Sequence, residues 1–308
     1  ERTDDLRGRG QQRDDARRVR CAHVKIYLPL WSYLRRRGSR LNVAAVKPDA
    51  PRLFPLPASR ATISRLAALS NTTTEGQDNP MQDKPTNLAA TQPGGEPLKP
   101  LTQAILERRA TNQFAPDEVP EETLNAILQL ALQAPSGYNL QPWRFIVVRE
   151  EENRKRLQAV AFNQAKVGQA PVVVIAVGMK EDWKQTADEV FREGAERGAG
   201  SLDTVEQYKQ GALQFVSSMP QDVWVNRHTM IAFTTLMYAA EVYGFDTAPM
   251  EGFDAAGVKR EFGLPDEAEV VALLAIGRAQ SPDKVYPGRF PLERVVYSER
   301  YGEAWGSK

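Results

Sequence analysis

Residues Ala134 to Val148 read APSGYNLQPWRFIVV, a loop rich in turn-forming residues that runs directly into a β-type segment. Prolines and a glycine interrupt the backbone of the loop at Pro135, Gly137 and Pro142. The polar residues between them carry hydroxyl and amide groups and no charge: Ser136, Asn139 and Gln141. Such a set of donors and acceptors suits a polar ring system or a partner chain.

The composition describes a mostly globular chain. Its 308 residues are 42% hydrophobic, which is enough for a sizeable core in one or two domains. Forty basic residues balance 39 acidic ones, for a net charge of +1. The whole molecule therefore carries no field that would make nucleic acid or an anionic membrane its main partner.

Cysteine and histidine are scarce. Cys21 is the sole cysteine, so no disulfide can form within the chain, and a reducing compartment is compatible with this. His23 and His228 are the two histidines, which excludes a His or Cys metal cluster within one chain. No apolar run approaches the roughly 18 residues of a membrane span, and Ile26 to Leu34 is broken by Pro29. We expect no metal, no membrane partner and a cytoplasmic protein.

Residues 1–96 differ in composition from the rest. Asp49 is the only acidic residue between Ala16 and Thr74, and a Gln-, Pro- and Gly-rich stretch follows. Such a segment buries little apolar surface, so we predict a disordered Arg- and Pro-rich leader. It could be a transit peptide or a nucleic-acid tail, but we favour sequence upstream of a true start at Met81. The globular domain is predicted to span residues 97–308.

Hydrophobic periodicity predicts alternating helices and strands from Pro97 onward. We expect helices over 100–109, 120–132, 151–162 and 222–243, and strands over 144–149, 171–178 and 269–277. The strand at 171–178 is apolar throughout, which indicates burial on both faces. Residues 182–221 are amphipathic and contain several glycines, which favours a surface excursion over a site.

Familiar cofactor motifs are missing from the sequence. No Gly-x-Gly-x-x-Gly follows a strand, and neither a phosphate-binding P-loop nor a Gly-x-Ser-x-Gly elbow occurs. A cofactor would therefore be held by scattered side chains. His228 lies in an apolar helical segment, where a hydrogen-bonded core imidazole is a commoner role than an acid or a base.

The segment Arg108–Arg109–Ala110–Thr111–Asn112–Gln113–Phe114 resembles the Arg-Arg-Ser-x-Arg-x-Phe signature of the FMN-dependent nitroreductase family. By that resemblance Arg108 and Arg109 help to hold the FMN phosphate, for which the planar guanidinium fork is well matched. The chain departs from the signature at Ala110 and Asn112. At Asn112 a neutral amide replaces a cation beside the flavin, so we expect less positive potential there.

Four other segments resemble elements of the same family. In Phe162–Lys166 the resemblance assigns Asn163 to the pyrimidine end of the ring and Lys166 to its N1 and C2 carbonyl. In Gly244–Asp254 the backbone near Glu251 and Gly252 approaches the flavin, with a backbone N–H reaching N5, and Arg289 in Gly288–Leu292 adds a phosphate contact. The cofactor-binding residues implied in these segments and in the opening loop are Pro135, Ser136, Gly137, Asn139, Gln141, Asn163, Lys166, Pro249, Met250, Glu251, Gly252 and Arg289.

The resemblance covers about Leu101 to Trp305 and implies an α+β, nitroreductase-like fold with a central, mostly antiparallel sheet flanked by helices. It further implies an intertwined homodimer with FMN at the subunit interface. The expected activity is ping-pong hydride transfer from NADPH or NADH to a nitroaromatic or quinone, with no catalytic protein residue. The alternatives are a dehalogenase or dehydrogenase of the same fold, or a flavin-binding protein with little turnover.

Overall fold

The computed structural model describes residues 81, 84–85, 88–281 and 285–306. The predicted leader falls outside these residues except for its last part. Leu88 and Ala89 pack against the main hydrophobic cluster, and the Ala89 carbonyl accepts a hydrogen bond from the Tyr243 hydroxyl at 2.8 Å. These contacts lie ahead of the predicted boundary at Pro97, and the boundary itself stays a prediction.

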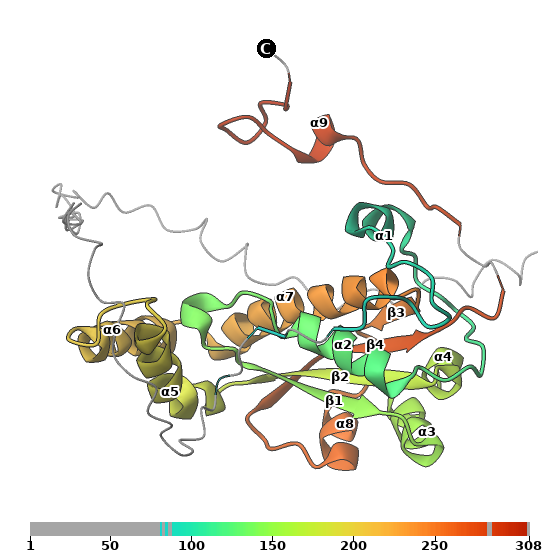
Figure 1. The fold of residues 1–308 in the computed structure, drawn as a ribbon, viewed down its shortest axis with the longest axis horizontal. Helices are drawn as coiled ribbons and strands as arrows, with labels where there is room; N and C mark the ends of the chain where they lie inside the picture. Colours follow the sequence, from blue (N-terminus) through green and yellow to red (C-terminus); the bar gives the residue numbers. More distant parts are fainter. Residues whose placement is uncertain (1–80, 82–83, 86–87, 282–284, 307–308) are drawn as a thin grey trace, which may run out of the picture. The chain divides into compact units, whose positions relative to one another are not determined.

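A four-stranded antiparallel sheet forms the centre of the fold (Figure 1). Its strands are β1 (Trp143–Val148), β2 (Val172–Met179), β3 (Asp246–Met250) and β4 (Ala268–Gly277), in the order β1-β2-β4-β3. Each neighbouring pair is antiparallel, and the β2–β4 register shifts between Ala176 and Val177. The predicted strands are confirmed to within a residue or two, and so is the α+β class.

Strand β2 is buried on both faces. Val172, Val174 and Ala176 belong to a cluster with helix α7, while Val173, Ile175 and Val177 belong to a second cluster with α3, α4 and α8. Successive residues of a strand point to opposite faces, so an all-apolar strand needs a cover on each side. Figure 1 shows α2 and α7 on one side of the sheet and α3 and α8 on the other.

The helices agree with the hydrophobic periodicity. The longest, α7 (Gln221–Val242), carries apolar groups around most of its circumference and packs against all four strands and α2. The described helical elements are α1 (Leu101–Glu107), α2 (Glu121–Ala131), η2 (Gly137–Asn139), α3 (Glu151–Val160), α4 (Ala165–Gln169), α5 (Asp182–Glu196), α6 (Val205–Ser217), α7, α8 (Ala255–Phe262) and α9 (Leu292–Val295).

Helix α1 ends earlier than predicted. The sequence indicates a helix to Arg109 with a basic last turn, but α1 stops at Glu107 and Arg108 has an extended backbone with ψ 125°. The reason is tertiary: the Thr111 N–H donates to the Thr247 carbonyl at 3.0 Å, and Ala110 forms a parallel bridge to Thr247. Both arginines therefore lie in a segment that runs beside β3.

The predicted surface excursion is a pair of helices, α5 and α6. They share a cluster with the first turn of α7, in which Trp183, Phe191 and Trp224 are buried. Figure 1 shows this pair at one end of the sheet, with α3 and α4 at the other. Within the described residues, no helix combines the length and the apolar character needed to cross a bilayer.

The carboxy-terminal tail exposes large apolar side chains. The exposed fraction is 81% for Val285, 90% for Tyr301 and 59% for Trp305. The tail folds back on itself through a bridge between Tyr297 and Ala304. Docking of this tail on a partner subunit stays a prediction.

Candidate functional site

The arginine segment after α1 contains buried polar groups that no described residue satisfies. One terminal nitrogen of Arg108, Nη1, is buried without a hydrogen-bond partner among the described residues. The hydroxyls of Thr111 and Thr247, both fully buried, are in the same condition. A buried guanidinium nitrogen is costly unless an acceptor reaches it, so this segment is suited to an anionic ligand.

Arg109 and Arg289 meet on one aromatic ring. The guanidinium carbon of Arg109 lies 4.5 Å from the centre of the Tyr286 ring, and that of Arg289 lies 5.7 Å from the same centre. Cation–π contacts of this kind stabilise an exposed cation by about 0.5–1 kcal/mol. Tyr286 thus brings two predicted phosphate ligands together, although they are 180 residues apart in sequence.

The segment 162–166 lies against the turn that follows β3. The Gln164 side chain donates to the Gly252 carbonyl at 2.7 Å, and the Asp254 N–H donates to the Val160 carbonyl at 2.8 Å. A Cβ at Gly252 would make only ordinary contacts with the chain, the nearest at 3.6 Å. Packing within the chain therefore does not require glycine there, and the position is open to a close ligand.

The other predicted residues of these segments sit as follows. Asn163 has φ 54°, a left-handed conformation, and Lys166 is half-buried on α4. Pro249 and Met250 complete β3, Glu251 is exposed just beyond it, and Ala110 and Asn112 are exposed beside the arginines. Asp254 caps α8 by accepting from the Ala256 N–H at 3.1 Å. The structure thus brings four of the five predicted segments together.

The fifth segment, the loop of residues 135–141, is held by hydrogen bonds within the loop and to α7. The Ser136 hydroxyl accepts from the Gln141 N–H at 2.9 Å, and the Gly137 N–H donates to Nδ1 of His228 at 3.4 Å. Pro135 is exposed just ahead of it. The side chains of Asn139 and Gln141 line a cavity of about 420 Å³, together with Arg144, Thr186 and Glu189 among others.

The loop and the arginine segment lie at opposite ends of β2. Thr111 of the arginine segment bonds to Thr247, which pairs through Ile276 with Val172 at the start of β2. The Pro142 carbonyl, at the end of the loop, accepts from the Met179 N–H at the other end of β2. Eight extended residues span about 26 Å at 3.3 Å each. The two groups therefore cannot enclose one ring system within a single chain.

His228 is partly buried. Its ring centre lies 4.6 Å from that of Trp224, and burial, followed by the charge of Arg227, lowers its pKa below 6.5. The neutral form is the one that leaves a lone pair on Nδ1 for the Gly137 N–H. The expected structural role is consistent with this contact, which joins α7 to the loop.

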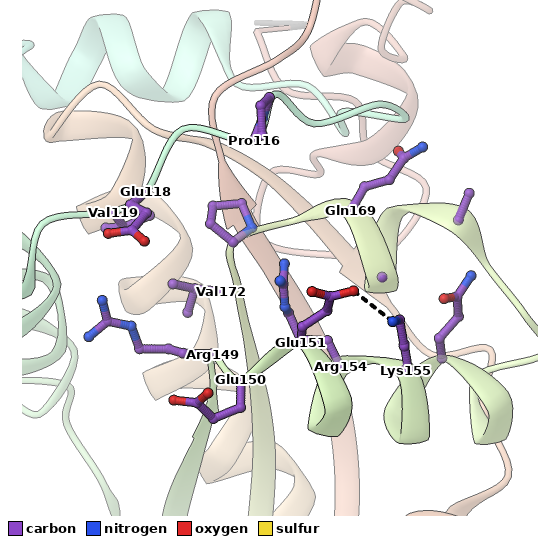
Figure 2. Close-up of a pocket in the computed structure, with 14 residues that line it drawn as sticks. Pro116, Glu118, Val119, Arg149, Glu150, Glu151, Arg154, Lys155, Gln169 and Val172 are labelled. Atoms are coloured by element: carbon purple, nitrogen blue, oxygen red, sulfur yellow. Dashed lines mark ion pairs between the residues drawn. The ribbon is translucent and has the colours of Figure 1, made fainter.

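A larger cleft of about 710 Å³ lies elsewhere, between the 116–119 segment and helices α3 and α4 (Figure 2). It is lined by both signs of charge, including Arg149, Arg154 and the Glu151–Lys155 ion pair at 2.6 Å. No predicted cofactor residue lines it. Opposite charges close together give this cleft no net preference for an anion.

Three residues of the site escaped the sequence analysis. Tyr286 carries no motif, and the buried hydroxyls of Thr111 and Thr247 become notable only when their neighbours are known. Thr111 does stand inside the quoted arginine signature, which is the one signal that could have found it.

Comparison with known proteins identifies relatives over the same region. The model of the Nitroreductase family matches residues 105–278. An NADH dehydrogenase of Thermus thermophilus is 37% identical over 204 residues, covering 65% of this chain and 96% of the relative. MhqN, a provisionally assigned NAD(P)H nitroreductase of Bacillus subtilis, is 30% identical over 208 residues, covering 64% and 97%.

Solved structures show the same fold. The provisionally assigned nitroreductase ydfN of Bacillus subtilis superposes with a TM-score of 0.60 at 27% identity, covering 64% of this chain and 97% of that one. A provisionally assigned nitroreductase of Exiguobacterium sibiricum, solved in complex with FMN, gives 0.60 at 24% identity and covers 65% and 98%. The family match extends over more than half of the chain and includes the arginine segment, β1 with its loop, and the whole sheet, so the chain belongs to the Nitroreductase family.

Proposed function

We propose that this protein is an FMN-dependent oxidoreductase that passes reducing equivalents from NADPH or NADH to a small electron acceptor, a nitroaromatic or a quinone, in a ping-pong cycle. The observation that carries the proposal is the buried Nη1 of Arg108, which has no hydrogen-bond partner among the described residues. It lies in a segment that matches the family's phosphate-binding signature, within the region covered by the family model. A phosphate oxygen is the acceptor that such a nitrogen lacks.

The phosphate would be held by Arg108, Arg109 and Arg289. Guanidinium groups present paired N–H donors that fit phosphate oxygens, and the stacking on Tyr286 limits where two of them can go. A preformed cluster of cations also has less side-chain freedom to lose on binding. Thr111 and Thr247 place hydroxyl donors beside the same segment.

The ring would lie against Asn163, Lys166 and the turn at Glu251–Gly252. When bound, FMN supplies the two-electron chemistry of both half-reactions. Lys166 would hold a positive charge beside the ring, which would favour the reduced, more negative form of the bound flavin. Asn112 supplies a neutral amide where relatives place a cation, so the potential here is more negative than with an arginine.

A homodimer completes the site in this proposal. The loop 135–141 is about 26 Å of strand away from the arginine segment of its own chain, so its polar side chains would serve the flavin of the partner. Exposed apolar side chains on α1 and the tail, such as Leu106 at 72% and Tyr301 at 90%, favour burial against a second copy. A cytoplasmic location stays a prediction.

A second candidate is a flavin-binding protein with little turnover, which the departures at Ala110 and Asn112 favour. Reactions such as dehalogenation or substrate dehydrogenation are the alternative within the fold, because α5 and α6 form an extended surface element. These candidates differ in how fast a nicotinamide reduces the bound flavin.

The test is stopped-flow reduction of the full-length, FMN-loaded protein without oxygen. We expect bleaching of the flavin absorbance by NADPH or NADH and recovery on addition of a naphthoquinone. Bound flavin that neither nicotinamide bleaches would leave the binding protein as the surviving candidate. A protein that rejects added FMN would overturn the cofactor assignment.

A further inference from the structure

The loop of residues 136–141 is held in a strained backbone conformation. Tyr138 has φ 55° and ψ 18°, Asn139 has φ 57° and Gln141 has φ 45°. These are three of the six non-glycine residues with positive φ in the described part of the chain. A bulky tyrosine in the left-handed region is strained, and the conformation persists only where surrounding contacts enforce it.

An aromatic cluster supplies those contacts. The ring centre of Tyr138 lies 6.5 Å from that of Phe191 on α5, and 6.0 Å and 6.4 Å from those of Tyr208 and Phe215 on α6. Leu140, 1% exposed, is buried in the same region. Edge and tilted pairs at these distances are attractive beyond the area they bury, and three of them hold the Tyr138 ring.

The loop has an apolar and a polar part. Tyr138 and Leu140 pack into the α5–α6 cluster, and Leu140 also lines the adjoining cavity of about 420 Å³ beside Asn139 and Gln141. The two apolar side chains therefore anchor the loop, while the two polar side chains are presented at the cavity. On the other side His228 contacts Gly137, where a Cβ would approach Nε2 to 3.3 Å.

We propose that Tyr138 is a positioning residue: its ring, held by the α5–α6 pair, fixes the left-handed backbone that presents Asn139 and Gln141, and so couples the placement of α5 and α6 to flavin binding. The effect on flavin binding rests on the proposed function. The effect on the loop does not, because the conformation of the loop can be measured without flavin. Tyr138 touches neither acceptor nor cofactor in this scheme and acts through its neighbours.

The test compares Tyr138→Leu, which keeps bulk and removes the ring, with Tyr138→Phe, which keeps the ring. Amide hydrogen exchange at Asn139 and Gln141 reports the loop, and flavin titration reports the site. In Tyr138→Leu the ring contacts that hold the strained loop are lost. We therefore expect both amides to exchange about tenfold faster and the Kd for FMN to rise about tenfold. Tyr138→Phe is expected to behave as the natural protein.

A matched control separates positioning from general loosening. Leu213→Ala weakens the same cluster on α6 but keeps every aromatic ring that contacts Tyr138. At an equal loss of Tm it should leave the amides of Asn139 and Gln141 protected, and a loss of protection equal to that in Tyr138→Leu would overturn the proposal. Unchanged exchange and Kd in Tyr138→Leu would overturn it as well.

If Tyr138→Leu fails to fold, two variants in α6 test the same contacts. Tyr208→Leu and Phe215→Leu alter side chains that are 62% and 53% exposed, so the fold should tolerate them. Each removes one ring contact of Tyr138, so we expect faster exchange at Gln141 in both, and wild-type exchange in both would contradict the proposal. If the natural protein binds no FMN, the proposed function fails while the exchange experiment still decides the role of Tyr138.

Discussion

At the scale of single residues, the proposed phosphate site depends most on Arg108, whose Nη1 is buried without a hydrogen-bond partner among the described residues. Replacing it by methionine keeps most of the side-chain volume and removes the charge and the unsatisfied Nη1. A charged hydrogen bond contributes about 1.5–3 kcal/mol, so we expect Arg108→Met to raise the Kd for FMN about 10- to 100-fold. Quenching of flavin fluorescence on titration measures this.

Arg156→Met is the matched control for that prediction. Arg156 is exposed on α3, where its charge pairs only loosely with Glu152 at 3.8 Å. We expect the Kd of the Arg156→Met variant for FMN to equal that of the natural protein. An equal loss of affinity in both variants would mean that overall charge, rather than Arg108 itself, governs binding.

His228 makes stability depend on pH. Burial and then Arg227 lower its pKa, so the folded chain releases this proton more readily than the unfolded chain. The stability from neutral His228 is therefore complete above its ordinary pKa of 6.5 and is lost as pH falls below that value toward the lowered one. In urea unfolding from about pH 7 to 5, we expect His228→Asn to show a shallower fall in the free energy of unfolding.

His23 stays in place in both proteins, so the difference between the two curves isolates His228. Parallel curves would show that protonation of the imidazole does not disturb its contact with Gly137. Asparagine is chosen because its Oδ1 can still accept the Gly137 N–H while it does not titrate.

At the scale of elements, the end of β4 depends on a glycine. A Cβ at Gly277 would lie 2.6 Å from Cδ of Pro171 and 3.0 Å from Cδ1 of Phe114. Both neighbours are held in place, so Gly277→Ala should lower the free energy of unfolding by about 1–3 kcal/mol in urea. Gly211→Ala on α6 meets nothing within 4 Å and should be neutral or stabilising by up to about 1 kcal/mol. A neutral Gly277→Ala would show that the strand end can shift.

Elements followed the sequence closely wherever local pattern and burial agree. The all-apolar run of β2 predicted burial on both faces, and the helical repeat of α7 predicted its length to within a residue at each end. Helix α1 is the exception, because its end is set by the bonding of Thr111 to Thr247 on β3. A contact across 136 residues of sequence leaves no local signal.

At the scale of the whole molecule, we predict that the carboxy-terminal tail takes part both in the proposed phosphate site and in dimer assembly. Truncation after Ser281 removes Tyr286 and Arg289 together with the exposed apolar side chains that follow. We expect the truncated chain to lose the dimer and to bind FMN at least about tenfold more weakly, since one charged contact and the partner's loop are lost together. Light scattering after size exclusion and a flavin titration measure the two effects.

Arg289→Met in the full-length chain separates these effects. It removes one cation and leaves the apolar tail, so we expect a dimer with weakened FMN binding. A monomer with Arg289→Met, or a dimer after truncation, would contradict the role given to the tail.

The sequence by itself determined three of the four strands and the four longest predicted helices, because these depend on local periodicity, and its five family-like segments indicated the class of fold through their resemblance. Only the tertiary structure decided that Tyr286 gathers Arg109 and Arg289, that Tyr138 anchors its loop in a cluster from α5 and α6, and that the loop and the arginines lie at opposite ends of β2. The physical reason is that these features are distances between parts of the chain far apart in sequence, and such distances are set by how the layers pack.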